Sequence, residues 1–174
     1  MPQIMTERSR SRAFLGLGGN LADPLYQFRR AREQLADHPD IELRSSSPLY
    51  RTPPVGGPQG QPDYLNAVLE VRTELSPEEL LQLCQRLETH AGRTRKLHWG
   101  PRTLDIDLLF FADLTCSEKR LTLPHPRLHQ RHFVLLPLND LAPQLQHPLL
   151  EKSVAQLLTA LPPAEGISRI CETW

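Results

Sequence analysis

The stretch Trp99-Gly-Pro-Arg-Thr-Leu-Asp-Ile-Asp-Leu-Leu-Phe-Phe111 has the pattern of a turn that runs into a β-strand. A Gly-Pro loop signal opens it, and an apolar run that suits a sheet follows. Side chains alternate along a strand, so Asp105 and Asp107 should project from one face. Two neighbouring carboxylates repel one another unless a cation neutralises them, and Mg²⁺ prefers such oxygen ligands together with water and phosphate oxygens. The stretch therefore predicts a magnesium site on one face of a sheet.

A group of cations leads into this stretch. Arg93, Arg95, Lys96 and Arg102 fall in a span with no acid between Ala91 and Leu104. A basic cluster is most often a solvated face, and an Asp-x-Asp pair taken alone can be an edge strand kept soluble by inward charges. Cations beside a carboxylate pair instead indicate a polyanion bound between them and a metal.

Composition limits the class of protein. A chain of 174 residues can build one good core, so we expect a disordered tail over residues 1–12 and a single domain over 13–174. Lys plus Arg equals Asp plus Glu at 20 each, which argues against nucleic acid or a membrane surface as the main partner. Three separated cysteines suit a reducing cytoplasm, and no apolar run approaches the roughly 20 residues of a membrane span.

The remaining chain predicts alternating strands and helices. Strands are expected over residues 13–18, 41–50, 64–72 and 104–111, with a short one over 120–123. Asp23-Pro24 opens a helix that runs to about residue 37, the capping box Ser76-Pro-Glu-Glu79 opens another that ends near Gly92, and a last helix covers 153–161. Pro126 can open a further helix, with His125 near its cap and His129 and His132 on one face.

Two further features bear on the site. The proline- and glycine-rich loop 52–62 is too long for a tight hairpin, and loops of that kind are often lids. In the strand that follows, Tyr64 and Asn66 share one face, which we expect to be the face of Asp105 and Asp107. The dinucleotide fingerprint fails at Leu21, and the Walker-type phosphate loop is absent from the sequence.

The motifs, taken in order, resemble those of the 6-hydroxymethyl-7,8-dihydropterin pyrophosphokinase family of folate biosynthesis. The resemblance is collinear from about Ala13 to Pro148. The matching pieces are Gly-Gly-Asn20-Leu, Ser47-Pro-Leu-Tyr-Arg-Thr-Pro-Pro54, Gln61-Pro-Asp-Tyr-Leu-Asn66, Gly92-Arg-Thr-Arg-Lys96, Trp99-Gly-Pro-Arg-Thr-Leu-Asp-Ile-Asp107 and Leu123-Pro-His125. The resemblance implies a ferredoxin-like α+β fold, an antiparallel sheet with helices packed on one face and the active site on the other. It also implies that the terminal diphosphate of ATP passes to the pterin hydroxymethyl group with release of AMP, and we expect a monomer.

Roles follow from the resemblance residue by residue. Asp105 and Asp107 would hold two Mg²⁺ ions that bridge the triphosphate. The pterin would be bound by Thr52, Pro53, Val55, Tyr64, Asn66 and Phe133, with Trp99 closing over the site. The mobile catalytic loop would supply Arg93 and Arg95. The nucleotide or phosphate side would comprise Gln85, Glu88, Trp99, Arg102, Ile106, Arg120, Thr122, His125 and Arg131.

Three departures from the family pattern stand out: Gly19 replaces a frequent serine, Pro126 replaces a frequent tyrosine, and the loop between Lys96 and Trp99 is one residue shorter. The shorter loop leaves open whether His98 takes a basic role there.

Two rival functions remain at this point. A metal-dependent phosphohydrolase would use Asp105 and Asp107 with His125, His129 and His132, since histidine-rich centres favour zinc or related metals. It would leave Tyr64 and Asn66 without a task. A non-enzymatic nucleotide-binding module of the same fold is the second rival, and it would release no product when given ATP and a pterin.

Overall fold

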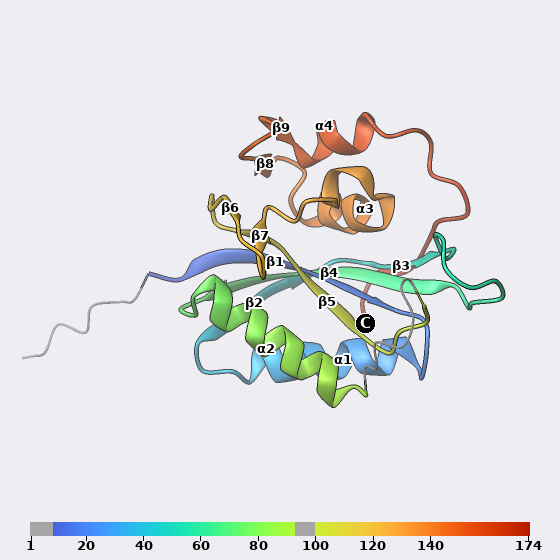
Figure 1. The fold of residues 1–174 in the computed structure, drawn as a ribbon, viewed down its shortest axis with the longest axis horizontal. Coiled ribbons are helices and arrows are strands. Elements are labelled where there is room, and N and C mark those ends of the chain that lie inside the picture. The colour runs from blue at the N-terminus through green and yellow to red at the C-terminus, as the bar shows by residue number, and fades with distance from the viewer. Residues whose placement is uncertain (1–8, 93–99) are drawn as a thin grey trace, which may run out of the picture.

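An antiparallel sheet forms the centre of the molecule (Figure 1). The computed structural model describes residues 9–92 and 100–174. Six strands pair in the order β10-β3-β4-β1-β5, with β2 also on β4. Their bounds are β1 Ser11–Gly19, β2 Ile41–Ser46, β3 Leu49–Thr52, β4 Tyr64–Thr73, β5 Asp105–Phe111 and β10 Ser168–Cys171. The sheet thus begins two residues before the predicted start of the domain at residue 13.

Two helices cover one face of the sheet, α1 (Pro24–Ala36) and α2 (Pro77–His90). Both begin as their sequences predict: Asp23 accepts from the Tyr26 N–H, and the Ser76–Glu79 capping box is formed. Their apolar stripes pack with the sheet into the larger core. That core leaves the other sheet face for the remaining elements.

The opposite face carries two more helices, α3 (His132–Leu141) and α4 (Val154–Thr159). The prediction that the helices pack on one face is therefore wrong for these two. The reason lies in the strands: Phe14, Val68 and Leu109 are apolar on this face and form a second core with both helices. Exposing that surface to water would be costly, so α3 covers one half of the face and leaves the other half to the site.

The predicted strand over 41–50 is two strands. Ser47 and Pro48 interrupt it, because proline has no N–H for the ladder. Ser47 instead bonds β4 through both its backbone and its side chain, since its N–H donates to the Val68 carbonyl and its Oγ accepts from the Val68 N–H, each over 2.8 Å. β2 and β3 therefore lie one after the other along β4.

The helix predicted to open at Pro126 is also wrong. Residues 128–130 form a short 3-10 turn, and α3 begins only at His132. Arg131 lies between them with extended backbone angles, φ −123° and ψ 109°. His129 and His132 therefore do not share a helical face. Two small hairpins complete this side, β6 Cys116–Ser117 with β7 Thr122–Leu123 and β8 Gln146–His147 with β9 Lys152–Ser153.

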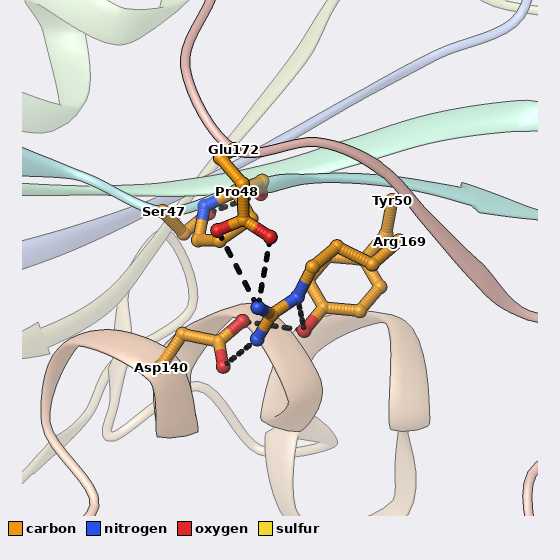
Figure 2. Close-up of polar contacts among 6 residues, drawn as sticks. All are labelled: Ser47, Pro48, Tyr50, Asp140, Arg169 and Glu172. Atoms are coloured by element: carbon orange, nitrogen blue, oxygen red, sulfur yellow. Dashed lines mark hydrogen bonds and ion pairs between the residues drawn. The ribbon is translucent and has the colours of Figure 1, made fainter.

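The last residues of the chain are tied back to the sheet. From α4 they pass the edge of the sheet, pair β10 with β3, and end beside α1 (Figure 1). Figure 2 shows the anchor, in which Arg169 reaches Asp140 of α3 over 2.6 Å, Glu172 over 3.0 Å and the Tyr50 hydroxyl over 3.4 Å. Trp174 is buried on Phe28, and its ring N–H donates to the Ser47 carbonyl over 2.7 Å.

Within residues 9–92 and 100–174, none of the helices is long and apolar enough to cross a membrane.

Candidate active site

A cavity of about 480 Å³ lies on the α3 side of the sheet, beside that helix. It extends over β1 and β4 between two walls, the loop that follows β3 and the start of α3. Its described lining is Gly16, Leu17, Gly18, Thr52, Pro53, Val55, Gly56, Tyr64, Asn66, Ala67, Val68, Arg102, Asp105, Asp107, Gln130, Arg131, His132, Phe133, Val134, Glu165 and Ile167. The predicted carboxylate pair and the predicted pterin residues thus share one cavity.

Asp105 and Asp107 stand at the β5 end of the cavity. They face β1 at two glycines, since Asp105 pairs with Gly18 and Asp107 with Gly16. A Cβ at Gly16 would meet Leu109 at 3.4 Å, and one at Gly18 would meet the Asn66 amide nitrogen at 3.2 Å. Any side chain at these positions would therefore fill the floor of the cavity, a role for both glycines that reasoning from the sequence missed.

The chain around Arg102 is fixed by the turn after β1. The Arg102 carbonyl accepts from the N–H groups of Asn20 and Leu21, and its N–H donates to Asn20 Oδ1 over 2.9 Å. A Cβ at Gly19 would approach the Thr103 carbonyl to 2.7 Å, which explains why glycine suits this position in this chain. The Arg102 side chain forms an ion pair with Asp105 over 2.5 Å.

Glu88 of α2 supports β5, the strand that carries Asp105 and Asp107, from the face of the sheet that α1 and α2 cover. It is buried and accepts a hydrogen bond from the Ile106 N–H over 2.8 Å. Ile106 points its side chain into the core on the α1 and α2 face. Because Ile106 lies between Asp105 and Asp107, this bond orients the strand at the two carboxylates.

The opposite end of the cavity carries the predicted pterin residues. Thr52 Oγ1 donates to Asn66 Oδ1 over 2.7 Å, and both side chains are buried. The Tyr64 hydroxyl donates to the Gly100 carbonyl over 3.1 Å, and burial raises the Tyr64 pKa. Phe133 lines the other wall, with the Arg131 guanidinium 5.4 Å from its ring centre. Tyr64 and Phe133 thus offer aromatic surfaces on two sides of one space.

On the α3 side, burial lowers the pKa of both Arg131 and His125, but only His125 becomes neutral at physiological pH. Burial lowers the pKa of Arg131 from its usual value, and Asp107 and Asp105 act in the opposite sense. Burial, with help from Arg131, lowers the pKa of His125 to about 4. His125 is thus neutral at physiological pH, consistent with its Nδ1 accepting from the Arg127 N–H over 3.2 Å.

Several predicted residues lie away from the described cavity lining. Arg120 and Thr122 are in the β6–β7 hairpin region, and Gln85 lies on the outer side of α2 in a separate shallow hollow. The predictions for Arg93, Arg95 and Trp99 fall on residues outside the described part of the chain. Roles for all of these stay predictions.

The histidines predicted for a zinc-type centre do not form one. His129 contacts His147 ring to ring, with centroids 6.2 Å apart, and His132 bonds the Pro162 carbonyl through Nε2 over 2.6 Å. In the described ranges, no three His, Cys, Asp or Glu side chains are grouped so as to hold a metal ion. A pair of carboxylates that leaves most of the shell to water and phosphate fits Mg²⁺ better than a transition metal.

A family model described as 7,8-dihydro-6-hydroxymethylpterin-pyrophosphokinase matches residues 14–143. The chain belongs to this family.

Curated relatives carry the same name, 2-amino-4-hydroxy-6-hydroxymethyldihydropteridine pyrophosphokinase. One from Synechocystis is 43% identical over 146 residues, covering 84% of this chain and 74% of the relative. One from Pseudomonas aeruginosa is 42% identical over 159 residues, covering 91% of this chain and 96% of the relative.

A solved structure, the Plasmodium falciparum HPPK-DHPS A437G protein with pteroate, matches with a TM-score of 0.68 at 17% identity. The match covers 91% of this chain but only 44% of that larger protein, and at this identity it supports the fold alone.

Proposed function

We propose that this chain transfers the pyrophosphate group of ATP to the hydroxymethyl group of 6-hydroxymethyl-7,8-dihydropterin, releasing AMP, in folate biosynthesis. The observation that carries the proposal is the shared cavity. Asp105 and Asp107 line it from β5, and Thr52 and Asn66 line it from β3 and β4 on the other side of β1. A metal-bound triphosphate and a flat heterocycle can therefore meet inside one space. Family membership supports the same reaction, with ATP as co-substrate.

Asp105 and Asp107 would hold two Mg²⁺ ions, because paired carboxylates with an open approach suit ions that keep water and phosphate oxygens as ligands. Bound there, the ions would neutralise charge on the triphosphate and on the departing AMP. Arg102 keeps Asp105 oriented through its 2.5 Å ion pair, and Glu88 fixes the strand between the carboxylates.

Little covalent chemistry is needed from the protein. The pterin hydroxyl oxygen forms a bond to the β-phosphorus while the bond to the α,β-bridging oxygen breaks, so that AMP leaves and the hydroxyl proton is released. The protein contributes alignment and charge neutralisation. We assign the latter to Arg102, Arg93 and Arg95, the last two as parts of a loop that acts when charge develops.

The pterin would lie between Tyr64 and Phe133, with Asn66 bonded to its edge. Rigid aromatic walls are suited to a flat heterocycle because they lose little entropy on binding. Pro53 and Val55 would form the side wall, and Trp99 would close over the ring. The Thr52–Asn66 bond supports this assignment because it holds the amide in one orientation.

The nucleotide would extend from the carboxylates towards α3. Arg131, partly buried beside Asp107, supplies a cation for phosphate, and neutral His125 supplies a hydrogen-bond partner. The other nucleotide-side residues in the proposal are Gln85, Glu88, Ile106, Arg120 and Thr122.

We further propose that the fold is ferredoxin-like and that residues 13–174 act as one domain, as a monomer in the cytoplasm. The order β1-α1-β2-β3-β4-α2-β5, in which β2 and β3 pair with successive parts of β4 and all neighbouring strands are antiparallel, supports the fold assignment. Three free cysteines suit a reducing compartment.

The test is a product assay with ATP, Mg²⁺ and 6-hydroxymethyl-7,8-dihydropterin. Equal amounts of AMP and pterin diphosphate are expected. ATP hydrolysis without a modified pterin would overturn the proposal.

A further inference from the structure

Residues 162–167, between α4 and β10, form a wall of the cavity that no motif pointed to. Glu165 and Ile167 both line the cavity. Gly166 lies between them with a φ of +70°, and a Cβ built on it would be 3.3 Å from Pro53 Cγ. The 162–167 segment thus runs against the loop after β3, the side wall that we assign to the pterin.

This segment is held in place from its far end. β10 pairs with β3, and Arg169 joins Asp140 of α3 and the Tyr50 hydroxyl of β3 (Figure 2). Tyr50 also donates to Asp140. Tyr50 is two residues from Thr52 and pairs with Asn66 in the sheet. The contacts that anchor β10 therefore lie next to Asn66, which lines the cavity.

The charges of the cavity then fall at two ends. Three acids are found in its described lining: Asp105, Asp107 and Glu165. β5 is two strands from β4, so Asp105 lies roughly 10 Å to one side of Asn66 at the usual strand spacing of about 4.8 Å. Glu165 precedes β10, which lies on the other side of β4 beyond β3. A ligand whose phosphates meet the β5 end would present its opposite end to Glu165.

Asn66 supplies only part of the hydrogen bonding that a pterin at the β3 end of the cavity needs. Its Oδ1 already accepts from Thr52, and its Nδ2 lies 3.2 Å from the Cβ position of Gly18 on the cavity floor. Asn66 therefore offers the ligand a donor. A pterin needs acceptors as well, because its 2-amino group and N3–H form an adjacent pair of donors, and a carboxylate can accept from both at once.

We propose that Glu165 is a specificity-determining residue, whose carboxylate accepts hydrogen bonds from the 2-amino and N3–H edge of the pterin, with Ile167 packing beside the ring. The inference rests on the proposed function, since it needs the pterin ring at the β3 end of the cavity. Glu165 acts in binding, and the transfer step does not use it.

The test measures equilibrium binding of 6-hydroxymethyl-7,8-dihydropterin in the presence of Mg²⁺ and a non-hydrolysable α,β-methylene ATP. Glu165→Ala should raise the pterin Kd about tenfold, the effect of losing an exposed charge-assisted hydrogen bond. Glu165 is exposed, so the melting temperature should not change. The KM for ATP should also stay the same.

A second ligand tests whether Glu165 acts through its hydrogen bond to the 2-amino group or through the shape of the cavity. The 2-oxo analogue of the same bicycle keeps N3–H but presents a carbonyl in place of the 2-amino donor, so Glu165→Ala should lose less affinity for it than for the pterin. The matched control is Glu151→Gln, which changes an exposed acid in the turn before β9, outside the described cavity lining. It should leave pterin binding unchanged.

Three outcomes would overturn the inference: a pterin Kd for Glu165→Ala within twofold of the original, an equal loss for the 2-oxo analogue, or an equal loss in Glu151→Gln. Failure of the proposed function would be seen separately, as no AMP and no pterin diphosphate from the unmodified protein.

Discussion

Thr52 Oγ1 donates a hydrogen bond to Asn66 Oδ1 across 2.7 Å, in a buried contact between β3 and β4. The bond fixes which end of the Asn66 amide faces the cavity floor. Without it the amide could rotate and exchange a donor for an acceptor. The hydrogen-bonding selectivity at the pterin end of the cavity thus depends on Thr52, an uncharged side chain.

Thr52→Val should therefore weaken pterin binding about tenfold while the ATP KM stays the same. It should also lower the free energy of unfolding by about 1–2 kcal/mol, because a buried acceptor loses its partner. Thr73→Val is the control, since buried Thr73 donates to the Asp40 carbonyl at the far end of β4. The control should lose stability without losing pterin affinity. Equal pterin binding in both variants would contradict the assignment.

Asp107→Asn should reduce turnover by roughly three orders of magnitude with little change in melting temperature. A neutral amide keeps the shape but loses the charge that a metal needs. Asp113→Asn is the matched control, because Asp113 follows β5 in an exposed turn. Steady-state assays at saturating Mg²⁺ measure the effect, and near-normal turnover of Asp107→Asn would refute the metal assignment.

Glu88→Ala should cost both stability and activity. Its carboxylate is buried and accepts from the Ile106 N–H, so removal leaves a buried donor unpaired at a cost of about 1–3 kcal/mol. Turnover should fall as well because Asp105 and Asp107 flank Ile106. Glu33→Ala on the exposed side of α1 should change neither quantity. Urea denaturation measures the stability of each variant, and steady-state assays measure its turnover. If Glu88→Ala changed neither quantity, β5 would be positioned by other contacts.

His125 should make stability fall as the pH drops from about 6.5 to about 4. Burial holds its folded pKa at about 4, whereas the unfolded side chain titrates near 6.5, so the unfolded state binds the extra proton in that window. Between pH 7 and pH 5 the loss should be roughly 1–2 kcal/mol. His125→Asn should lose less over the same interval, as measured by urea denaturation at each pH. Equal losses in the two proteins would mean that His125 is not buried in its neutral form.

Much of the fold could be predicted from the sequence because its signals are local. The capping box at Ser76 and the Asp23-Pro24 start each depend on a few adjacent residues, and α2 and α1 begin there. The carboxylate strand was predicted from alternation, and Asp105 and Asp107 do share the cavity with Tyr64 and Asn66.

The parts that were missed depend on distant contacts. β10 forms because Arg169 and Trp174 find partners more than 100 residues earlier, at Tyr50 and Ser47, and no local pattern encodes that. α3 lies over the sheet because Phe14, Val68 and Leu109 need cover. Gly16 and Gly18 could have been recognised as floor positions only once their partners on β4 and β5 were known.

In the proposed reaction the pterin hydroxymethyl group attacks the β-phosphorus of ATP, and the nucleotide product distinguishes this from attack at the γ-phosphorus. Chromatography of a reaction with ATP, Mg²⁺ and 6-hydroxymethyl-7,8-dihydropterin should give AMP and pterin diphosphate in equal amounts, with no ADP. Stoichiometric ADP with a pterin monophosphate would instead show attack at the γ-phosphorus and would refute pyrophosphate transfer.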